Sequence, residues 1–139
     1  MENPKVTPKE YRDFLEGVKL KGIYLKDVNA KVDRDLIITE RLPKVSIYDT
    51  ASYKFNKEGF KVENKFTLTS KNKERKQVLK IECTFVLNFT SEKEINDDLF
   101  EVYQNVSLPF NTWPFVRELA FSISSRMNIP PLTLPLLKG

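Results

Sequence analysis

Hydrophobic and polar residues alternate most regularly between positions 60 and 90 of the chain. From Leu79 to Phe89 every second residue is apolar, and the residues between them are mainly polar or charged. The run from Phe60 to Leu68 alternates in the same way, with Asn64 as the one polar residue on its apolar side. Such alternation is typical of a β-strand that buries one face. The pattern therefore predicts two strands, each with one apolar face.

Two further strands are predicted ahead of these. The first covers residues 18–32, where Gly22 interrupts the alternation, and a glycine inside a strand commonly marks a bulge. The second covers residues 44–55 and is followed by Asn56–Gly59, a sequence typical of a hairpin turn. Four strands with one apolar face each predict an antiparallel sheet over residues 18–90 that needs a cover on one side.

Two short helices are predicted from the spacing of a capping box. Thr7–Glu10, with a proline at the first helical position, predicts a helix over residues 8–16. Ser91–Glu94 has the same spacing and predicts a second helix that continues to about Asn105.

A long helix is predicted near the C-terminus. Pro114 is expected in its first turn, where backbone amides have no intrahelical acceptor. Its end is expected at Asn128, ahead of Pro130 and Pro131, because asparagine tolerates a left-handed cap and proline cannot continue a helix. Apolar residues cover so much of its circumference that we expect contacts on two sides, such as its own sheet and a second subunit.

The predicted fold class is therefore α+β, a four-stranded antiparallel sheet with helices packed on one face. One domain is expected over residues 1–139, because this length suits a single modest core. Its predicted parts are an N-terminal helix (1–17), the sheet (18–90), a helical layer (91–128) and an apolar tail (129–139).

Composition narrows the functional classes. The chain has 40% hydrophobic and 30% charged residues, which is typical of a globular protein, and no apolar run approaches the ~20 residues that span a bilayer. The N-terminus lacks the apolar core of a signal peptide, so a cytoplasmic location is expected. Cys83 is the single cysteine, and its place in an apolar strand predicts a buried, unreactive thiol.

The sequence offers few groups for catalysis. It contains no histidine, no glycine-rich phosphate-binding loop and no cysteine cluster that could hold zinc. The acidic pair Asp97 and Asp98 lies near a predicted helix start, where negative charge is favourable. We therefore expect no enzyme activity, no cofactor and no metal site.

The net charge of +4 is mildly basic and lacks the dense positive field of a dedicated nucleic-acid-binding protein. Lysines near aromatic residues such as Tyr48 and Phe60 would suit single-stranded nucleic acid stacked on the sheet. The aromatic residues of the best-defined strands alternate inward, however, which would leave the exposed lysines without stacking partners. We expect no specific nucleic acid, and a small α+β module that binds RNA or a ligand stays as an alternative from a different class.

A small sheet and its helices cannot bury all the apolar residues of the crossover after the first strand, the start of the long helix and the tail. Exposed apolar patches usually mark contacts with another subunit or a partner. Apolar grooves bind side chains of extended polypeptides with little regard to sequence. A polypeptide-binding groove is therefore predicted from Leu36, Ile38, Leu42, Val45, Phe110, Trp113, Leu132 and Leu134.

One ordered set of residues resembles a known family. Residues 113–118 form the run Trp-Pro-Phe-Val-Arg-Glu, Ser125-Arg126 follows two turns later, and residues 129–134 form the exit Ile-Pro-Pro-Leu-Thr-Leu. This arrangement resembles the long helix and its exit in the SecB family of export chaperones. Ile23–Asp27 and Asp49-Thr50 are similar to other segments of that family, so the resemblance covers about residues 18–137.

The resemblance implies a chaperone that holds unfolded or other non-native polypeptides without ATP, its client being a preprotein or an antitoxin. It also implies a homodimer or homotetramer in which the long helices pack between dimers. General protein export and a toxin–antitoxin system both stay open as its context. The positions expected at the contact between subunits are Ile23, Val116, Arg117, Ala120 and Ser124.

Two departures from the family concern the motor protein SecA. Family members generally continue past the Leu-x-Leu exit into a further helix and often a charged, metal-binding tail that docks on SecA, whereas this sequence ends at Gly139. Lys31 and Lys80 stand where classical members carry acidic residues on the exposed sheet face, and only Asp27 stays acidic. We therefore expect client holding to be retained and docking on SecA to be in question.

Overall fold

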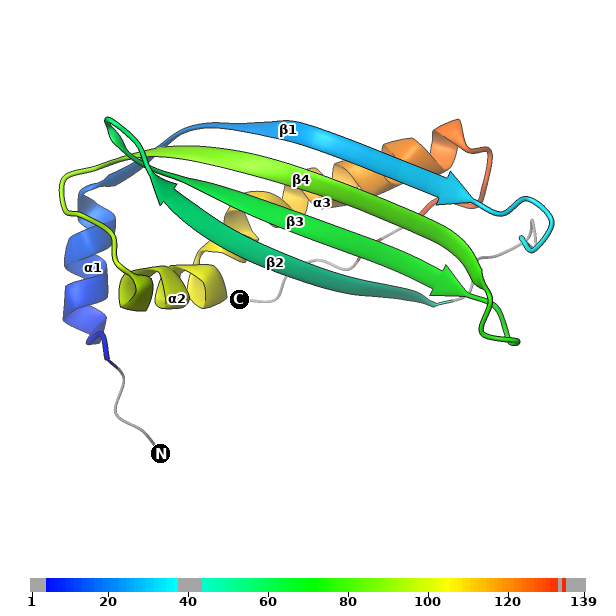
Figure 1. The fold of residues 1–139 in the computed structure, drawn as a ribbon, viewed down its shortest axis with the longest axis horizontal. Coiled ribbons are helices and arrows are strands. Elements are labelled where there is room, and N and C mark those ends of the chain that lie inside the picture. Colours follow the sequence, from blue (N-terminus) through cyan, green and yellow to red (C-terminus); the bar gives the residue numbers. More distant parts are fainter. Residues whose placement is uncertain (1–4, 38–43, 133, 135–139) are drawn as a thin grey trace.

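The computed structural model describes residues 5–37, 44–132 and 134 (Figure 1). Two of the predicted groove residues, Ile38 and Leu42, lie outside the described residues. The helices and strands follow in the order α1 (Pro8–Glu16), β1 (Val18–Val32), β2 (Val45–Phe55), β3 (Gly59–Lys71), β4 (Gln77–Ser91), α2 (Asp97–Val106) and α3 (Leu108–Arg126).

The four strands form one antiparallel sheet in the order β1-β4-β3-β2, which confirms the predicted sheet. The central strands β3 and β4 bury every second residue on one face, as their alternation predicts. Asn64 lies on that buried face and is 1% exposed. Its amide donates hydrogen bonds to Asp49 Oδ2 and to the carbonyl of Thr50, which offsets the cost of burying a polar group.

The edge strand β1 contains two irregularities. Its register with β4 shifts between Leu20 and Gly22 and again between Leu25 and Asp27. The first shift confirms the predicted bulge beside Gly22, and the second was not predicted. Each bulge adds one residue to β1, so side chains after it point to the face opposite to the one that strict alternation would give. Residues between the two bulges are therefore shifted to the other face, and the second bulge restores the original alternation.

The helices all lie on one side of the sheet, and the predicted α+β class is confirmed (Figure 1). Helix α3 crosses the central strands and buries Val116 and Ala120 against them. At the other end of the sheet, α1 packs Phe14 onto Phe60, with ring centroids 6.2 Å apart. Tyr103 of α2 packs edge-on against Phe89 at 5.5 Å.

The structure confirms α1 and corrects the start of α2. The Thr7 side chain caps α1 by accepting a hydrogen bond from the amide of Glu10. Helix α2, however, begins after Asn96, whose side chain accepts from the amide of Leu99. Ser91 is instead the last residue of β4, and its hydroxyl donates to the carbonyl of Lys93. The strand thus continues through the residue that we expected to start the helix.

Helix α3 also begins earlier than predicted. It starts at Leu108 with Pro109 in the first turn, so Pro114 lies inside the helix. A proline there removes the hydrogen bond to the carbonyl four residues earlier, which belongs to Phe110. Both residues are exposed, so water can satisfy that carbonyl. The predicted end is confirmed, because Asn128 adopts the left-handed conformation with a φ of 54°.

Candidate functional site

The predicted groove residues divide into a covered group and an open one. Leu132 and Leu134 are buried in the core, and Trp113 packs against Phe66 with ring centroids 6.4 Å apart. Val45 also packs against the core, from the start of β2. Leu36 is half-buried in the connection that follows β1. Arg34 of the same connection donates a hydrogen bond to the carbonyl of Met127, the residue that caps the end of α3. Phe110 alone among the described members is largely exposed.

The described residues of the C-terminal segment, 129–132 and 134, which we call the tail strap, lie against α3. Leu132 and Leu134 are both buried in the core. The amide of Leu132 donates to Ser124 Oγ at 3.1 Å, and Arg117 Nε donates to the carbonyl of Leu134 at 3.1 Å. The strap is therefore held by two buried leucines and by hydrogen bonds to its backbone.

The tail strap covers the β2 side of α3. It runs antiparallel to the helix, because its successive contacts go from Ser124 back to Arg117. Arg117 and Ser124 share a flank of the helix with Trp113, which contacts β3, the neighbour of β2. On the other flank, Phe115 contacts Phe85 of β4, the neighbour of β1.

The β1 side of α3 carries no comparable strap in the described part of the chain. Leu20, Leu25 and Val28 share the helix side of β1, because they pair in register with the inward residues of β4. Together with Val106, Phe110 and Phe115 they form an apolar strip that we call the β1–α3 surface, and each of its residues is 39–55% exposed. Two contacts show that the strip is continuous. Leu25 pairs with Phe85, which touches Phe115, and Leu20 lines the same hollow as Phe110.

A hollow of about 340 Å³ lies at one end of the β1–α3 surface. Its polar groups are already engaged. Tyr103 donates to Asn111 Oδ1 at 2.6 Å, and the hydroxyl of Ser107 bonds to that of Tyr11 at 2.6 Å. Burial raises the pKa of both tyrosines above the ordinary value. The hollow therefore offers apolar contacts and neutral hydroxyl groups. Its lining consists of Leu15, Val18, Leu20, Phe89, Tyr103, Val106, Ser107, Phe110 and Asn111.

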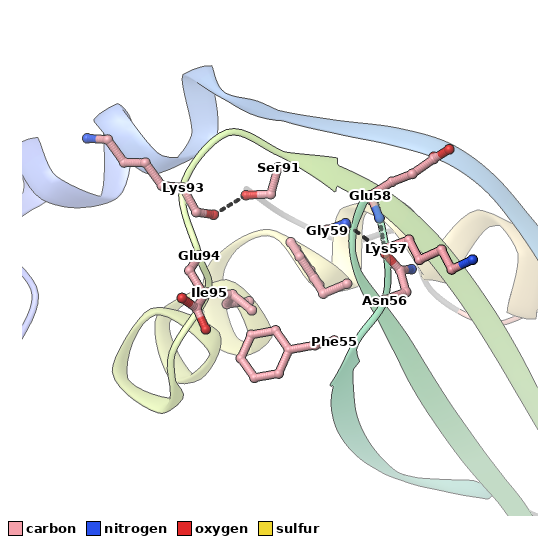
Figure 2. Close-up of a pocket in the computed structure, with 10 residues that line it drawn as sticks. Phe55, Asn56, Lys57, Glu58, Gly59, Ser91, Lys93, Glu94 and Ile95 are labelled. Carbon is pink, nitrogen blue, oxygen red and sulfur yellow. Dashed lines mark hydrogen bonds between the residues drawn. The ribbon is translucent and has the colours of Figure 1, made fainter.

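A second hollow of about 350 Å³ opens between the β2–β3 hairpin and the connection from β4 to α2 (Figure 2). Phe55 and Ile95 face each other across it, while its rim carries the polar turn residues of the hairpin. Asn56 Oδ1 accepts from the amides of Glu58 and Gly59, which fixes the hairpin turn.

Cys83 lies buried under the helices, as predicted. Burial, with a smaller contribution from the charge of Asp27, raises the pKa of its thiol to about 11. Because the thiolate is the reactive form, this thiol is a poor nucleophile at neutral pH. Among the described residues there is also no group of three or more cysteine, aspartate or glutamate side chains placed to hold a metal ion.

The residues predicted at a subunit contact occupy varied environments. Val116, Ala120 and Ser124 are buried within this chain, and Ile23 is half-buried on the helix side of β1. Arg117 bonds to the tail strap of its own chain. These five positions stay a prediction as subunit contacts, and the more exposed apolar side chains of α3 are those of Phe110, Phe115 and Phe121.

Sequence reasoning missed most of the β1–α3 surface, although the sequence contains a signal for it. The apolar residues on the helix side of β1 are separated by two positions except at 20–23 and 25–28, where the separation is three. These two longer separations mark the two bulges and place Leu20, Leu25 and Val28 on one face.

Comparison with known proteins identifies the fold as SecB-like. No family model and no curated protein sequence matches the chain. The solved structure of the Mycobacterium tuberculosis Rv1957 SecB-like chaperone, in complex with a ChAD peptide from the Rv1956 HigA1 antitoxin, is similar with a TM-score of 0.75 and 20% identity. The similarity covers 89% of this chain and 90% of that one. The resemblance stated from residues 113–134 is therefore confirmed at the level of the fold.

A second similar structure is a protein of unknown function from Streptococcus agalactiae. It has a TM-score of 0.53 and 10% identity, and the similarity covers 86% of this chain and 97% of that one. Within the described residues, no helix has the length and apolar character required to cross a membrane.

Proposed function

We propose that this protein is an ATP-independent holding chaperone that binds non-native polypeptides on its β1–α3 surface. The observation that carries this proposal is the tail strap. Through it the flank of α3 binds two leucines and backbone groups of its own chain. The opposite flank presents a comparable apolar strip without such a cover in the described part of the chain.

The chemistry of the β1–α3 surface suits clients of varied sequence. Burial of apolar area stabilises a complex by roughly 25 cal/mol per Å² without requiring directional contacts. The neighbouring edge of β1 adds backbone amides and carbonyls that can pair with an extended segment. A folded protein hides such segments in its core, so binding would select chains that have not folded.

We further propose that the predicted groove residues Leu36, Ile38, Leu42 and Val45 extend the binding region at the crossover. The protein would work in the cytoplasm as a homodimer or homotetramer. The similar mycobacterial chaperone was solved with an antitoxin peptide, so an antitoxin is one client class that we propose here, beside preproteins for export.

The test is suppression of aggregation of reduced α-lactalbumin by the protein. The double substitution Leu25→Asp and Phe115→Asp should abolish suppression, because it places two charges in the apolar strip. Tyr48→Asp is the control for an added charge, since it adds one charge at an exposed aromatic residue on the other face of the sheet. Trp113→Asp is less suitable, because Trp113 is half-buried and packs against the core, so its replacement would also destabilise the fold.

Two results would overturn the proposal. One is aggregation that proceeds unchanged in the presence of the wild-type protein, and the other is an equal loss of suppression in the Tyr48→Asp control. Native mass measurement with and without α-lactalbumin would give the number of subunits and show whether the client binds one assembly.

A further inference from the structure

The face of the sheet opposite the helices is uncovered and basic. Figure 1 shows all three helices on the other side. The strand register identifies the residues of this outer face. We count those from the cross-strand row that contains Lys19 to the row that contains Lys31. Its acidic residues are Asp27, Glu63 and Glu82, and its lysines are Lys19, Lys26, Lys31, Lys54, Lys61, Lys65 and Lys80.

The outer face accounts for the whole net charge of the protein. It carries seven of the 23 basic residues and three of the 19 acidic ones, which leaves sixteen of each elsewhere. These ten outer-face residues therefore carry a net charge of +4, and Lys21, in the first bulge of β1, is counted with the rest of the chain.

Two pairs of lysines lie directly opposite each other on neighbouring strands. Lys31 of β1 faces Lys80 of β4, and Lys54 of β2 faces Lys61 of β3. Like charges in such positions destabilise a sheet. Lys80 is partly neutralised by Glu82 at 3.2 Å, but Lys31, Lys54 and Lys61 form no ion pair with any described residue. The sheet thus tolerates repulsion that an anionic partner would relieve.

The middle of the outer face is close to neutral. Lys26 donates to Glu63 at 2.9 Å, and Glu82 accepts from both Lys65 and Lys80. These hydrogen bonds are the main reason why the pKa of each glutamate lies below its ordinary value. The surplus positive charge therefore lies toward the two ends of the face, at the Lys54–Lys61 pair and at the Lys31–Lys80 pair.

The register gives the separation of the two lysine pairs. Lys80 pairs with Thr69 of β3, eight residues along the strand from Lys61. At ~3.3 Å per residue the pairs lie about 26 Å apart along the strands. A polypeptide with two carboxylate clusters at this spacing would reach both pairs at once.

We propose that the outer face docks an acidic polypeptide segment with two carboxylate clusters about 26 Å apart. A nucleic acid fits the face less well. Tyr24 and Tyr48 are exposed beside the lysines, at 51% and 67%, so the expectation that these lysines lack aromatic neighbours is wrong. The two rings, however, lie on opposite edge strands and cannot stack on successive bases. The central Glu63 and Glu82 would also repel a phosphate backbone.

The probes are two fluorescent peptides of identical composition. Each has two clusters of three glutamates. Five serine and threonine residues separate the clusters in one peptide, so that the cluster centres lie eight residues apart, or about 26 Å in an extended chain. One residue separates them in the other peptide, with the remaining four residues at its end. Fluorescence anisotropy should show about tenfold tighter binding of the widely spaced peptide, because only that peptide engages both pairs at once. Raising the salt concentration should weaken its binding.

Two double variants should each remove this advantage, namely Lys31→Glu with Lys80→Glu and Lys54→Glu with Lys61→Glu. The matched control is Lys9→Glu with Lys93→Glu, which makes the same change of charge in exposed lysines outside the outer face. The control should keep the spacing preference. Circular dichroism melting would confirm that every variant is folded.

Equal binding of the two peptides would overturn the proposal, and so would an equal loss of binding in the control variant. Tighter binding of an oligothymidylate than of the widely spaced peptide would also overturn it, in favour of a nucleic-acid surface. Suppression of α-lactalbumin aggregation should be unchanged in all these variants, because the β1–α3 surface is on the other side of the sheet. Failure of this inference is therefore distinguishable from failure of the proposed chaperone function.

Discussion

Both edge strands of the sheet lie beside α3, but the helix flank is covered on the β2 side and open on the β1 side. Beside β2, the tail strap lies against the flank of α3 and its leucines are part of the core. Beside β1, the row of Leu20, Leu25 and Val28 stays open next to Phe115. On the covered side the flank of α3 binds two leucines and backbone groups of its own chain, and this contact is the basis for proposing a client on the open side.

The attachment of the two edge strands differs as well. On the β2 side, the buried Asn64 amide bonds to Asp49 and Thr50, and Tyr53 donates to Asp97 of α2 at 2.6 Å. On the β1 side, Lys26 reaches across β4 on the outer face to bond Glu63 of β3. The covered edge is thus held by hydrogen bonds from Asn64 and Tyr53, and the open edge by an exposed ion pair.

The largest expected effect comes from weakening the tail strap. Leu132→Ala and Leu134→Ala should each lower the free energy of unfolding by about 2–5 kcal/mol, because each removes buried methyl groups from the core. Urea denaturation followed by tryptophan fluorescence would measure this. A loss below about 1 kcal/mol would show that the strap is only loosely attached, and the contrast between the two edges would fail.

A smaller effect on stability is expected at the open edge. Leu25→Ala should lower the free energy of unfolding by less than about 1 kcal/mol, because its side chain is already partly in water. The same variant should suppress less aggregation of α-lactalbumin per subunit. If Leu25→Ala proved as destabilising as Leu134→Ala, the β1–α3 surface would have to be covered in the native assembly.

The smallest expected effect concerns pH. The pKa of Glu63 is lower in the folded protein than its ordinary value of 4.5, chiefly because Lys26 donates a hydrogen bond to it. Its contribution to stability is therefore present above pH 4.5 and is lost as the pH falls through the lower, folded pKa. The melting temperature of Glu63→Gln should be slightly below that of the wild type at pH 7, and the difference should shrink toward pH 3.

Glu58→Gln is the matched control for this measurement, because Glu58 lies in the β2–β3 turn and forms no ion pair with a described residue. If the melting temperatures of Glu63→Gln and the wild type differ by the same amount at pH 7 and pH 3, the Lys26–Glu63 ion pair does not stabilise the attachment of β1.

The sheet could be predicted because alternation is a local property. Strands β3 and β4 are central, so their inward residues are mainly apolar, with Asn64 and Ser70 as the buried polar exceptions on β3. The start of α3 could not be predicted, since Pro109 and Pro114 are both compatible with a first turn by sequence alone. Similarly, Ser91 and Asn96 are both good caps, and the hydrogen bonds of β4 to its neighbours decide between them.

The candidate site was predicted less well than the fold, because it depends on contacts between distant segments. The sequence marks Leu132 and Leu134 as apolar, but it cannot show that Ser124 and Arg117 bind the backbone beside them. Exposed apolar residues and buried ones look alike in a sequence. The bulges of β1 are the exception, since the spacing of its apolar residues contains enough information to place them.

The burial of Cys83 has a practical consequence for experiments on this protein. Its thiol is shielded and scarcely ionised near neutral pH. A cysteine introduced at an exposed position would therefore take up a maleimide dye while the native one stays unlabelled. Energy transfer could then measure the distance between a labelled client and either edge of the sheet. Only one residue of the protein would need to be replaced, and Cys83 could stay.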